Sequence, residues 1–236
     1  MNYIIWKDKD SREINGLLIS ELPPITKPNM RVNETVVDGV DGSIIEELGY
    51  ESYDRTIIIA LKVGADIDEI ISYFTGSGDI YFSNEPDKYY KARIIKNIDY
   101  ERLLRYRVAK VTFRVQPFKY RNEDYCLWSG SDEKKMIVTN NGNYTSKPFL
   151  YIIGSGTVAL SVNGDAVCRY TFPDGEDTVM LDCENQEAIK GYSAGATLYR
   201  NRNMIGEFPI FQAGENVITW GGSVSTIIVM NYSRWL

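Results

Sequence analysis

Short runs of β-branched and aromatic residues, separated by turn residues, fill most of the first half of the chain. We predict four strands from these runs, at residues 3–6, 17–20, 31–37 and 55–63. The run 55–63 is the densest in β-branched residues, as a buried strand should be. Two longer strands are predicted at 89–100 and 105–116, joined by a turn at 101–104. Polar and apolar residues alternate in the second, which indicates an antiparallel sheet with one buried face.

One segment has helical periodicity instead. The apolar residues at positions i, i+3, i+4 and i+7 are Ile67, Ile70, Ile71 and Phe74. Asp66 can cap the first turn, with Glu69 three residues later, and Gly76 can end the helix. We therefore expect a short helix at about 67–75, packed on the sheet.

The second half of the chain has almost only strand patterns. Strands are predicted at 149–153, 157–162, 165–172, 177–182, 216–220 and 225–232. Asn163-Gly164 is the strongest hairpin signal, and Gly154-Ser155-Gly156 reads as a turn between two strands. Short strands at this spacing suggest a β-sandwich.

Between the halves the pattern is polar and rich in turn residues. The stretch that begins with Pro117, Phe118 and Tyr120 is expected to break the sheet, and the junction extends past Asn143 to Pro148. A chain of 236 residues has room for two domains, each with its own core. We predict an N-terminal β domain with one helix at 1–125, a junction at 126–147 and a C-terminal β-sandwich at 148–236. The predicted fold class is mainly β with one short α-helix.

The charge is mildly acidic and evenly spread. Lys and Arg number 18 against 21 Asp and Glu in residues 1–128, and 8 against 11 in residues 129–236. This distribution gives no basic footprint for sequence-specific nucleic acid binding or for an anionic membrane. It suits a protein that surrounds nucleic acid without gripping it. No apolar run reaches the roughly 20 residues that membrane insertion needs.

Catalytic chemistry has few candidates. The chain has no histidine, no phosphate-binding loop, no dinucleotide fingerprint and no zinc spacing. The carboxylates that could serve a glycosidase are Glu46/Glu47, Asp99/Glu101 and Asp174/Glu176/Asp177. The last cluster is also a weak Ca²⁺ candidate. We predict no enzyme activity, no cofactor and no metal site. Cys126, Cys168 and Cys183 are an odd set with no C-x-x-C pair, and we expect them to be free, partly buried thiols in a chain kept in a reducing cytosol.

A glycine-rich segment lies between the strands 31–37 and 55–63. It contains Gly39, Gly42 and Gly49, with the apolar residues Ile44, Ile45 and Leu48 between them. A hairpin arm with apolar side chains beyond its own core can lie on a neighbouring subunit and extend its sheet. We therefore expect residues 38–54 to make an inter-subunit contact, and deletion of 42–49 to give folded monomers. The alternative, a mobile surface loop, stays open.

Three segments spread along the chain share turn chemistry. The first is Val37-Asp38-Gly39-Val40-Asp41-Gly42, followed by Tyr50-Glu51-Ser52-Tyr53-Asp54-Arg55. The second joins Gly76-Ser77-Gly78-Asp79-Ile80-Tyr81-Phe82 to Gln116-Pro117-Phe118-Lys119-Tyr120. The third runs from Asn141-Gly142-Asn143-Tyr144-Thr145-Ser146-Lys147-Pro148 to Ile152-Ile153-Gly154-Ser155-Gly156, and the chain ends with Tyr232-Ser233-Arg234-Trp235 before its last residue.

In order and spacing these segments resemble the distal tail protein family of long-tailed phages that infect Gram-positive bacteria. The match spans nearly the whole chain, although no single motif is specific. Val40 departs from the family, in which a basic residue often follows the first glycine of the Gly-x-x-Gly turn.

The resemblance implies a structural virion protein at the tail tip, made and assembled in the cytoplasm of the bacterial host. In the family, a β-sandwich-like N-terminal domain builds a ring, usually a homo-hexamer, and a galectin-like C-terminal β-sandwich projects outward. The implied partners are the major tail tube protein, the tail-associated baseplate hub protein and, for host attachment, receptor-binding proteins. The lumen would pass the tape measure and then DNA.

Two other classes of function remain open at this point. A carbohydrate-binding β-sandwich without catalysis could stack sugar rings on Trp220, Trp235 or Tyr192. A carboxylate-based glycosidase would use one of the acidic clusters named above.

Overall fold

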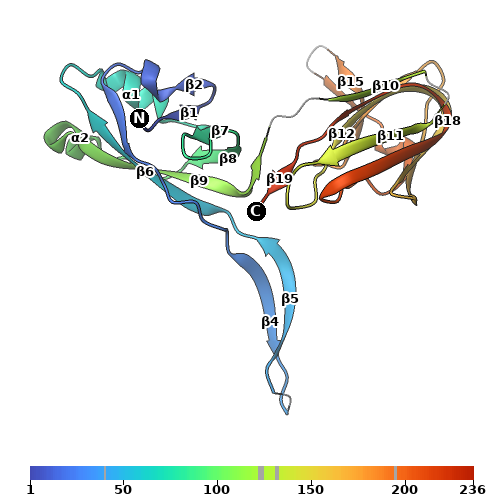
Figure 1. Ribbon diagram of the computed structural model, residues 1–236, viewed down its shortest axis with the longest axis horizontal. Helices are drawn as coiled ribbons and strands as arrows, with labels where there is room; N and C mark the ends of the chain where they lie inside the picture. Colours follow the sequence, from blue (N-terminus) through green and yellow to red (C-terminus); the bar gives the residue numbers. More distant parts are fainter. Residues whose placement is uncertain (40, 122–124, 131–132, 194–195) are drawn as a thin grey trace. The chain divides into compact units, whose positions relative to one another are not determined.

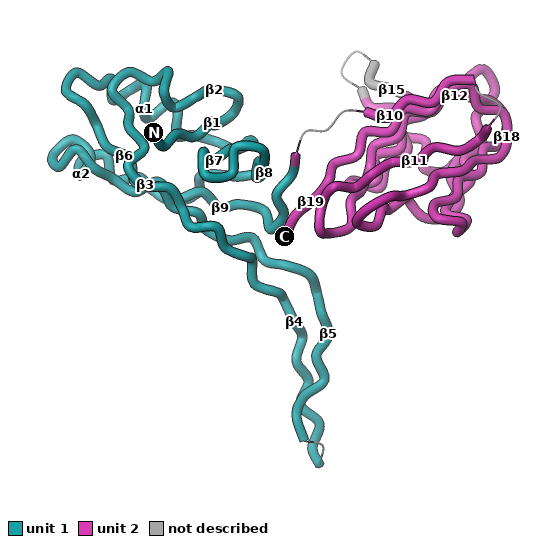
Figure 2. Tube along the Cα trace, in the orientation of Figure 1, with its two compact units in different colours: residues 1–120, 236 teal, residues 121–235 magenta. Residues whose placement is uncertain are grey.

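The chain folds into two compact units. The computed structural model describes residues 1–236 except 40, 122–124, 131–132 and 194–195. The side chains of residues 191–193 and 196 are also outside the described part. Residues 1–120 and the last residue form one unit, and 121–235 form the other (Figure 2). The predicted mainly β fold class is confirmed, with a second short helix that was not predicted. None of the helices in the described residues has the length and hydropathy that a membrane-spanning helix requires.

The first unit is built on one antiparallel sheet (Figure 1). Its strands are ordered β2-β1-β7-β8-β9-β6-β3. Their bounds are Ile4–Trp6 (β1), Lys9–Asp10 (β2), Leu17–Glu21 (β3), Tyr53–Leu61 (β6), Ser77–Phe82 (β7), Tyr89–Ile94 (β8) and Val108–Tyr120 (β9). A 3-10 turn, Ser11–Glu13, precedes β3, and a separate hairpin of β4 (Met30–Val36) and β5 (Ser43–Tyr50) lies between β3 and β6.

The core of the first unit follows from strand alternation. From Arg55 to Leu61, every second residue of β6 is buried, and the same holds for the part of β9 around Phe113. Helix α1 (Ile67–Tyr73) closes this face with Ile70, and Trp6 packs edge-on against Phe113 with ring centroids 5.2 Å apart. The predicted cap is present, because the Asp66 carboxylate accepts hydrogen bonds from the backbone amides of the second and third helical residues.

Three predictions for this unit were wrong. The strand expected at 89–100 ends at Ile94. Residues 101–104 are not a turn but part of a second helix, α2 (Tyr100–Tyr106), whose start is capped by Asp99. Pro117 does not break the sheet, since β9 continues to Tyr120. The ladder between β8 and β9 shifts register between Tyr90 and Ala92, opposite the proline. A bulge tolerates proline because no ladder hydrogen bond is required of it there.

The second unit is an antiparallel sheet ordered β10-β18-β12-β14-β15-β16, with β11 paired to β18 and β13 paired to β12 and β17. Its strands are Cys126–Ser129 (β10), Lys135–Asn140 (β11), Phe149–Val162 (β12), Asp165–Thr171 (β13), Thr178–Asp182 (β14), Glu187–Ser193 (β15), Ala196–Tyr199 (β16), Met204–Gly206 (β17) and Gly214–Met230 (β18). Arg234–Trp235 (β19) is not a strand of this sheet. A 3-10 turn, Asn201–Asn203, precedes β17. The predicted Asn163-Gly164 turn is confirmed, with both residues at positive φ.

The structure differs from two expectations for this half. The expected junction at 126–147 contains β10 and β11, which pair with β18 inside the second unit. Gly154-Ser155-Gly156 is no turn, because β12 runs through it with shifts in register against β18. A Cβ at Gly154 would lie 2.5 Å from the Ser223 carbonyl oxygen, so the close approach of two backbones explains that glycine.

The sheet of the second unit is curled, and the core residues lie on its inner face. Trp128 and Trp220 pack edge-on, with centroids 4.7 Å apart, among buried aliphatic residues of β12, β14 and β18. The three cysteines form no disulfide. Burial raises the pKa of the Cys168 thiol to about 11, which keeps the thiol protonated and unreactive at neutral pH.

A charge cluster gives the second unit a defined response to acid. The Glu176 carboxylate contacts Arg200 and Lys190, and these hydrogen-bonded cations, Arg200 foremost, lower the pKa of Glu176 to about 2 from 4.5. A carboxyl with a lowered folded-state pKa stabilises the fold above its unfolded pKa and loses that effect as the pH falls through its folded pKa. We expect the melting temperature of the second unit to drop between pH 4.5 and 2, and to drop less in Glu176→Gln.

Scanning calorimetry across this pH range tests that prediction. Glu215→Gln, at an exposed position of β18, is the matched control and should keep the wild-type profile. An acid-induced drop in Glu176→Gln as large as in the wild type would contradict the role of this cluster.

Candidate assembly interface

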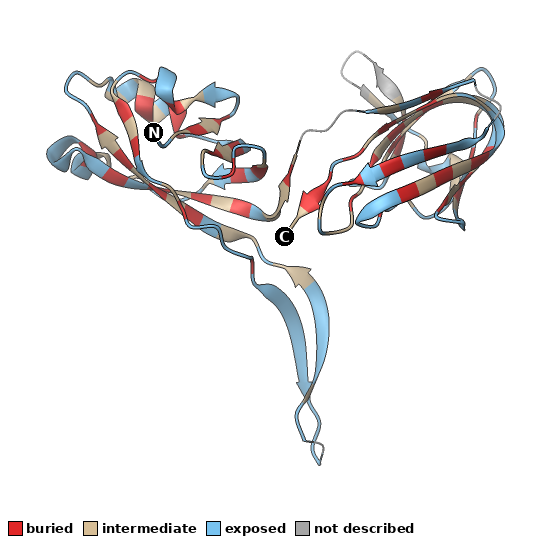
Figure 3. Ribbon diagram, viewed as in Figure 1, coloured by how far each residue is buried: buried red, intermediate tan, exposed pale blue. Residues whose placement is uncertain are grey.

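The hairpin of β4 and β5, residues 30–50, is called the arm below. Its two strands form their own sheet and project away from the sheet of the first unit (Figure 1). Every residue of β4 is exposed, and most residues of β5 are exposed as well (Figure 3). No described arm residue belongs to either hydrophobic core. Apart from Tyr50 at its base, the arm therefore exposes apolar side chains that lie outside both cores.

The register of the arm sorts its side chains onto two faces. Val32 lies opposite Glu47, Glu34 opposite Ile45, and Val36 opposite Ser43. Directly paired residues share a face of a sheet. These six side chains therefore line one face, which we call the docking face. It combines three exposed apolar groups with two carboxylates, and the most exposed of the apolar groups are Val36 at 72% and Ile45 at 61%.

The other face of the arm is more polar. Asn33 lies opposite Glu46 and donates a hydrogen bond to its carboxylate, and Thr35 lies opposite Ile44. The predicted site residues Ile44 and Ile45 thus point to opposite sides. Leu48 sits at the shift of register between Arg31 and Val32, and it is 48% exposed.

The three predicted arm glycines all have positive φ. Gly39 and Gly42 flank the tip, and Gly49 lies at the base beside the shift of register. A Cβ on any of them would meet no atom within 4 Å, so the backbone conformation alone requires glycine. Val40, the departure from the family pattern, lies outside the described residues.

The base of the arm is fixed to the first unit. The Tyr50 ring packs edge-on against Phe118 with centroids 6.0 Å apart, and the Glu51 amide donates to the Asn29 carbonyl at 2.9 Å. The Tyr53 hydroxyl donates to the Thr26 carbonyl at 3.4 Å. These contacts fix the direction in which the arm leaves the sheet.

The residues predicted for the domain junction lie in both units. Pro117, Phe118 and Tyr120 belong to β9, where Tyr120 stacks on Tyr89 with centroids 5.6 Å apart. Asn143 and Pro148 belong to the second unit, where the Pro148 carbonyl accepts from the Cys183 amide. Their role at a junction stays a prediction.

Of the residues considered for sugar binding, Trp220 is not placed to stack on a sugar ring. Trp220 is only 5% exposed and packs on Trp128, so its ring faces are not available to a ligand. Trp235 is half-buried and has contacts within the chain, and the Tyr192 side chain lies outside the described residues. The sequence alone did not show that Trp220 is a core residue and not a surface one.

Among the carboxylate candidates, Asp99 and Glu176 have structural partners. Glu46 and Glu47 point to opposite faces of β5, Asp99 caps α2, and Glu176 is paired with two cations. Within the described part of the chain, no three metal-ligating side chains gather into a possible metal site.

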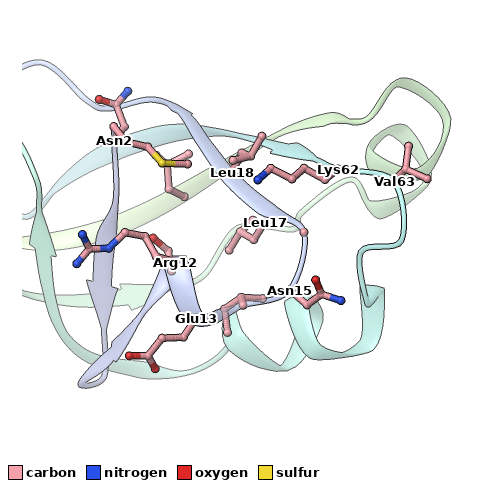
Figure 4. A pocket seen from close by; sticks show the side chains of 13 residues that line it. Asn2, Arg12, Glu13, Asn15, Leu17, Leu18, Lys62 and Val63 are labelled. Atoms are coloured by element: carbon pink, nitrogen blue, oxygen red, sulfur yellow. The ribbon is translucent and has the colours of Figure 1, made fainter.

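A groove of about 520 Å³ lies along the edge strand β3 (Figure 4). Asn2 is near one end of it, and Lys62 and Val63 are near the other. Glu13 is the only carboxylate among the residues that line it, whereas a glycosidase needs two. The groove therefore offers contact surface and no catalytic pair.

No protein-family model and no curated protein matches the sequence. Solved structures do match it. The crystal structure of SPP1 Dit (gp 19.1) protein, described as a paradigm of the hub adsorption apparatus in Gram-positive infecting phages, aligns over 100% of both chains with a TM-score of 0.72 and 13% sequence identity. A chain of the phage p2 baseplate in its activated conformation with Sr aligns over 98% of this chain and 97% of that one, with a TM-score of 0.51 and 9% identity.

At these identities the likeness is one of fold, and it extends along both units. The predicted resemblance is confirmed at that level: the chain has the fold of phage tail hub and baseplate proteins.

Proposed function

We propose that the chain is a structural component of a phage tail tip, in which copies form a closed ring between the tail tube and the baseplate. The observation that carries this proposal is the arm. It is ordered and anchored at its base, and it exposes apolar side chains that no part of its own unit covers. Exposed apolar residues gathered on one element mark a protein–protein contact.

A ring follows from the asymmetry of such a contact. In the proposed contact, the arm of one copy binds a different surface on the next copy. Head-to-tail contacts of this kind close into rings when the rotation between copies allows it. Six copies is the number that the family resemblance suggests. The first unit would build the ring, and the second would face outward toward baseplate and receptor-binding proteins.

The remaining features agree with a passive conduit. The tail tube protein would bind one side of the ring and a tail-associated baseplate protein the other. The formal net charge of −6 suits a lumen through which the tape measure and DNA pass without being held. We propose no catalytic role; among the acidic candidates, Asp99 caps α2 and Glu176 is ion-paired. Assembly would take place in the cytoplasm of the bacterial host.

Gold labelling tests the location directly. Antibodies raised against the purified chain should label the free tip of the tail in intact phage or tail-like particles. Label along the whole tube, on the head, or on no part of the particle would contradict the proposal.

A further inference from the structure

The end of the first unit that carries α2 has an unusual surface. It is made of residues 62–63 and 101–110, and we call it the helix surface. Its exposed apolar side chains are Val63, Leu104, Tyr106 and Val108, with Val63 at 95% and Tyr106 at 65%. Its exposed cations are Lys62, Arg102, Arg105, Arg107 and Lys110. Apolar and basic groups are therefore mixed on it.

The parts of the helix surface are held next to one another. The Leu61 amide donates to the Arg107 carbonyl at 2.9 Å, and Ala60 pairs with Val108 across β6 and β9. Five cations and one carboxylate, Glu101, leave the helix surface with a formal charge of +4. None of these cations forms an ion pair with any described residue. The described residues thus leave this charge without an ion-pair partner.

The arm has the opposite charge. Residues 30–50 contain Arg31 against the carboxylates Glu34, Asp38, Asp41, Glu46 and Glu47, which gives a formal charge of −4. None of these carboxylates is ion-paired with a described residue either. The arm and the helix surface therefore have opposite charges, and both expose apolar side chains that could pack together.

One copy cannot bring the two surfaces together. Strand β6 begins just beyond the base of the arm and ends at the helix surface. Nine strand residues span about 30 Å. The arm extends from the other end of β6 and away from α2 (Figure 1). A contact between them requires two copies of the chain.

We propose that the docking face of the arm binds the helix surface of the next copy in the ring. The inference rests on the proposed ring and names the surface that receives the arm. Val32, Val36 and Ile45 would lie against the apolar side chains of the helix surface, and Glu34 and Glu47 would pair with its arginines. Charge pairs of this kind set partner choice and speed association, while the apolar groups supply affinity.

Another basic region of the first unit fits less well. A groove of about 480 Å³ on the sheet is lined by Lys91, Arg93 and Arg114. Arg114 is already paired with Asp54 at 2.7 Å, and Lys91 lies over the Tyr120 ring. The groove also has only one large exposed apolar side chain, Ile95, to offer the arm.

A charge swap on the full-length chain tests the docking. Glu47→Lys and Arg105→Glu should each raise the protein concentration needed for half-assembly by roughly tenfold, and the double variant should return toward the wild-type value. Glu46→Lys, on the other face of the same strand, and Arg93→Glu, on β8, are the matched controls and should change it less than about twofold. Sedimentation velocity at two salt concentrations measures assembly, and far-ultraviolet circular dichroism checks folding.

Each outcome decides a separate point. Rescue in the double variant supports the docking even if a single variant assembles poorly. If Glu47→Lys and Arg105→Glu form rings as readily as the wild type does, the docking is overturned but the ring is not. The helix surface would then bind a different partner. A wild-type chain that stays monomeric at every concentration would overturn both.

Discussion

Removal of the arm is expected to turn a ring-forming chain into a folded monomer. Met30 lies directly opposite Tyr50 at the base of the hairpin, so an Asn-Gly turn can join them in place of residues 31–49. The first unit should keep its stability to within about 0.5 kcal/mol, because no described arm residue belongs to its core. Light scattering gives the mass, and thermal unfolding gives the stability.

The whole hairpin is a better target than β5 alone. Deletion of 42–49 would leave β4 without its partner and expose a free strand edge that invites aggregation. The matched control is the full arm with Asn33→Ser, a change on the polar face, which should assemble as the wild type does. Rings of normal mass from the armless chain would contradict the assembly role of the arm.

Arg55→Met is expected to destabilise the first unit by about 3 kcal/mol. Arg55 is 1% exposed, donates to the Tyr90 hydroxyl and lies 4.0 Å from the Glu85 carboxylate. Methionine fills a similar space but leaves Glu85 buried with Lys119 as its remaining cation, at 2.8 Å. Removal of one partner from a buried charge network destabilises a protein by more than the intact network stabilises it, because the other charge is left buried without its partner.

Urea unfolding measures this loss as a shift in the transition of the first unit. Arg93→Met, at an exposed position of β8, is the matched control and should change stability by less than about 0.5 kcal/mol. If the free energy of unfolding falls no more in Arg55→Met than in the control, the buried network does not stabilise the first unit.

Local chemistry in the sequence was enough to predict several elements. The Asp66 cap and the apolar stripe with Ile70 defined α1, and Asn163-Gly164 defined a hairpin. In each case the signal and the structure it specifies lie within a few residues of each other.

The errors arose where a distant strand decides the local structure. Pro117 stays in β9 because the facing strand shifts register there, and Gly154 continues β12 because β18 passes close to it. Helix α2 was missed although Asp99 could have been recognised as its cap. Only Leu103 of its residues is buried, so it lacks the apolar stripe that defined α1.

The candidate site was predicted in outline and not in detail. Glycines around apolar residues indicated an arm, but its two faces follow from the pairing of β4 with β5, which composition does not fix. The helix surface was not predicted at all. Its basic side chains are close in sequence, but their match with the acidic arm became visible only once the two were seen at opposite ends of β6.

The central claim is that copies of this chain close into a ring. Negative-stain electron microscopy of the purified full-length chain tests it most directly, together with the mass of the same sample. We predict closed rings of uniform size with an open lumen, at about six times the 26.9 kDa of one chain. Monomers alone at every concentration, or open filaments that never close, would contradict the account.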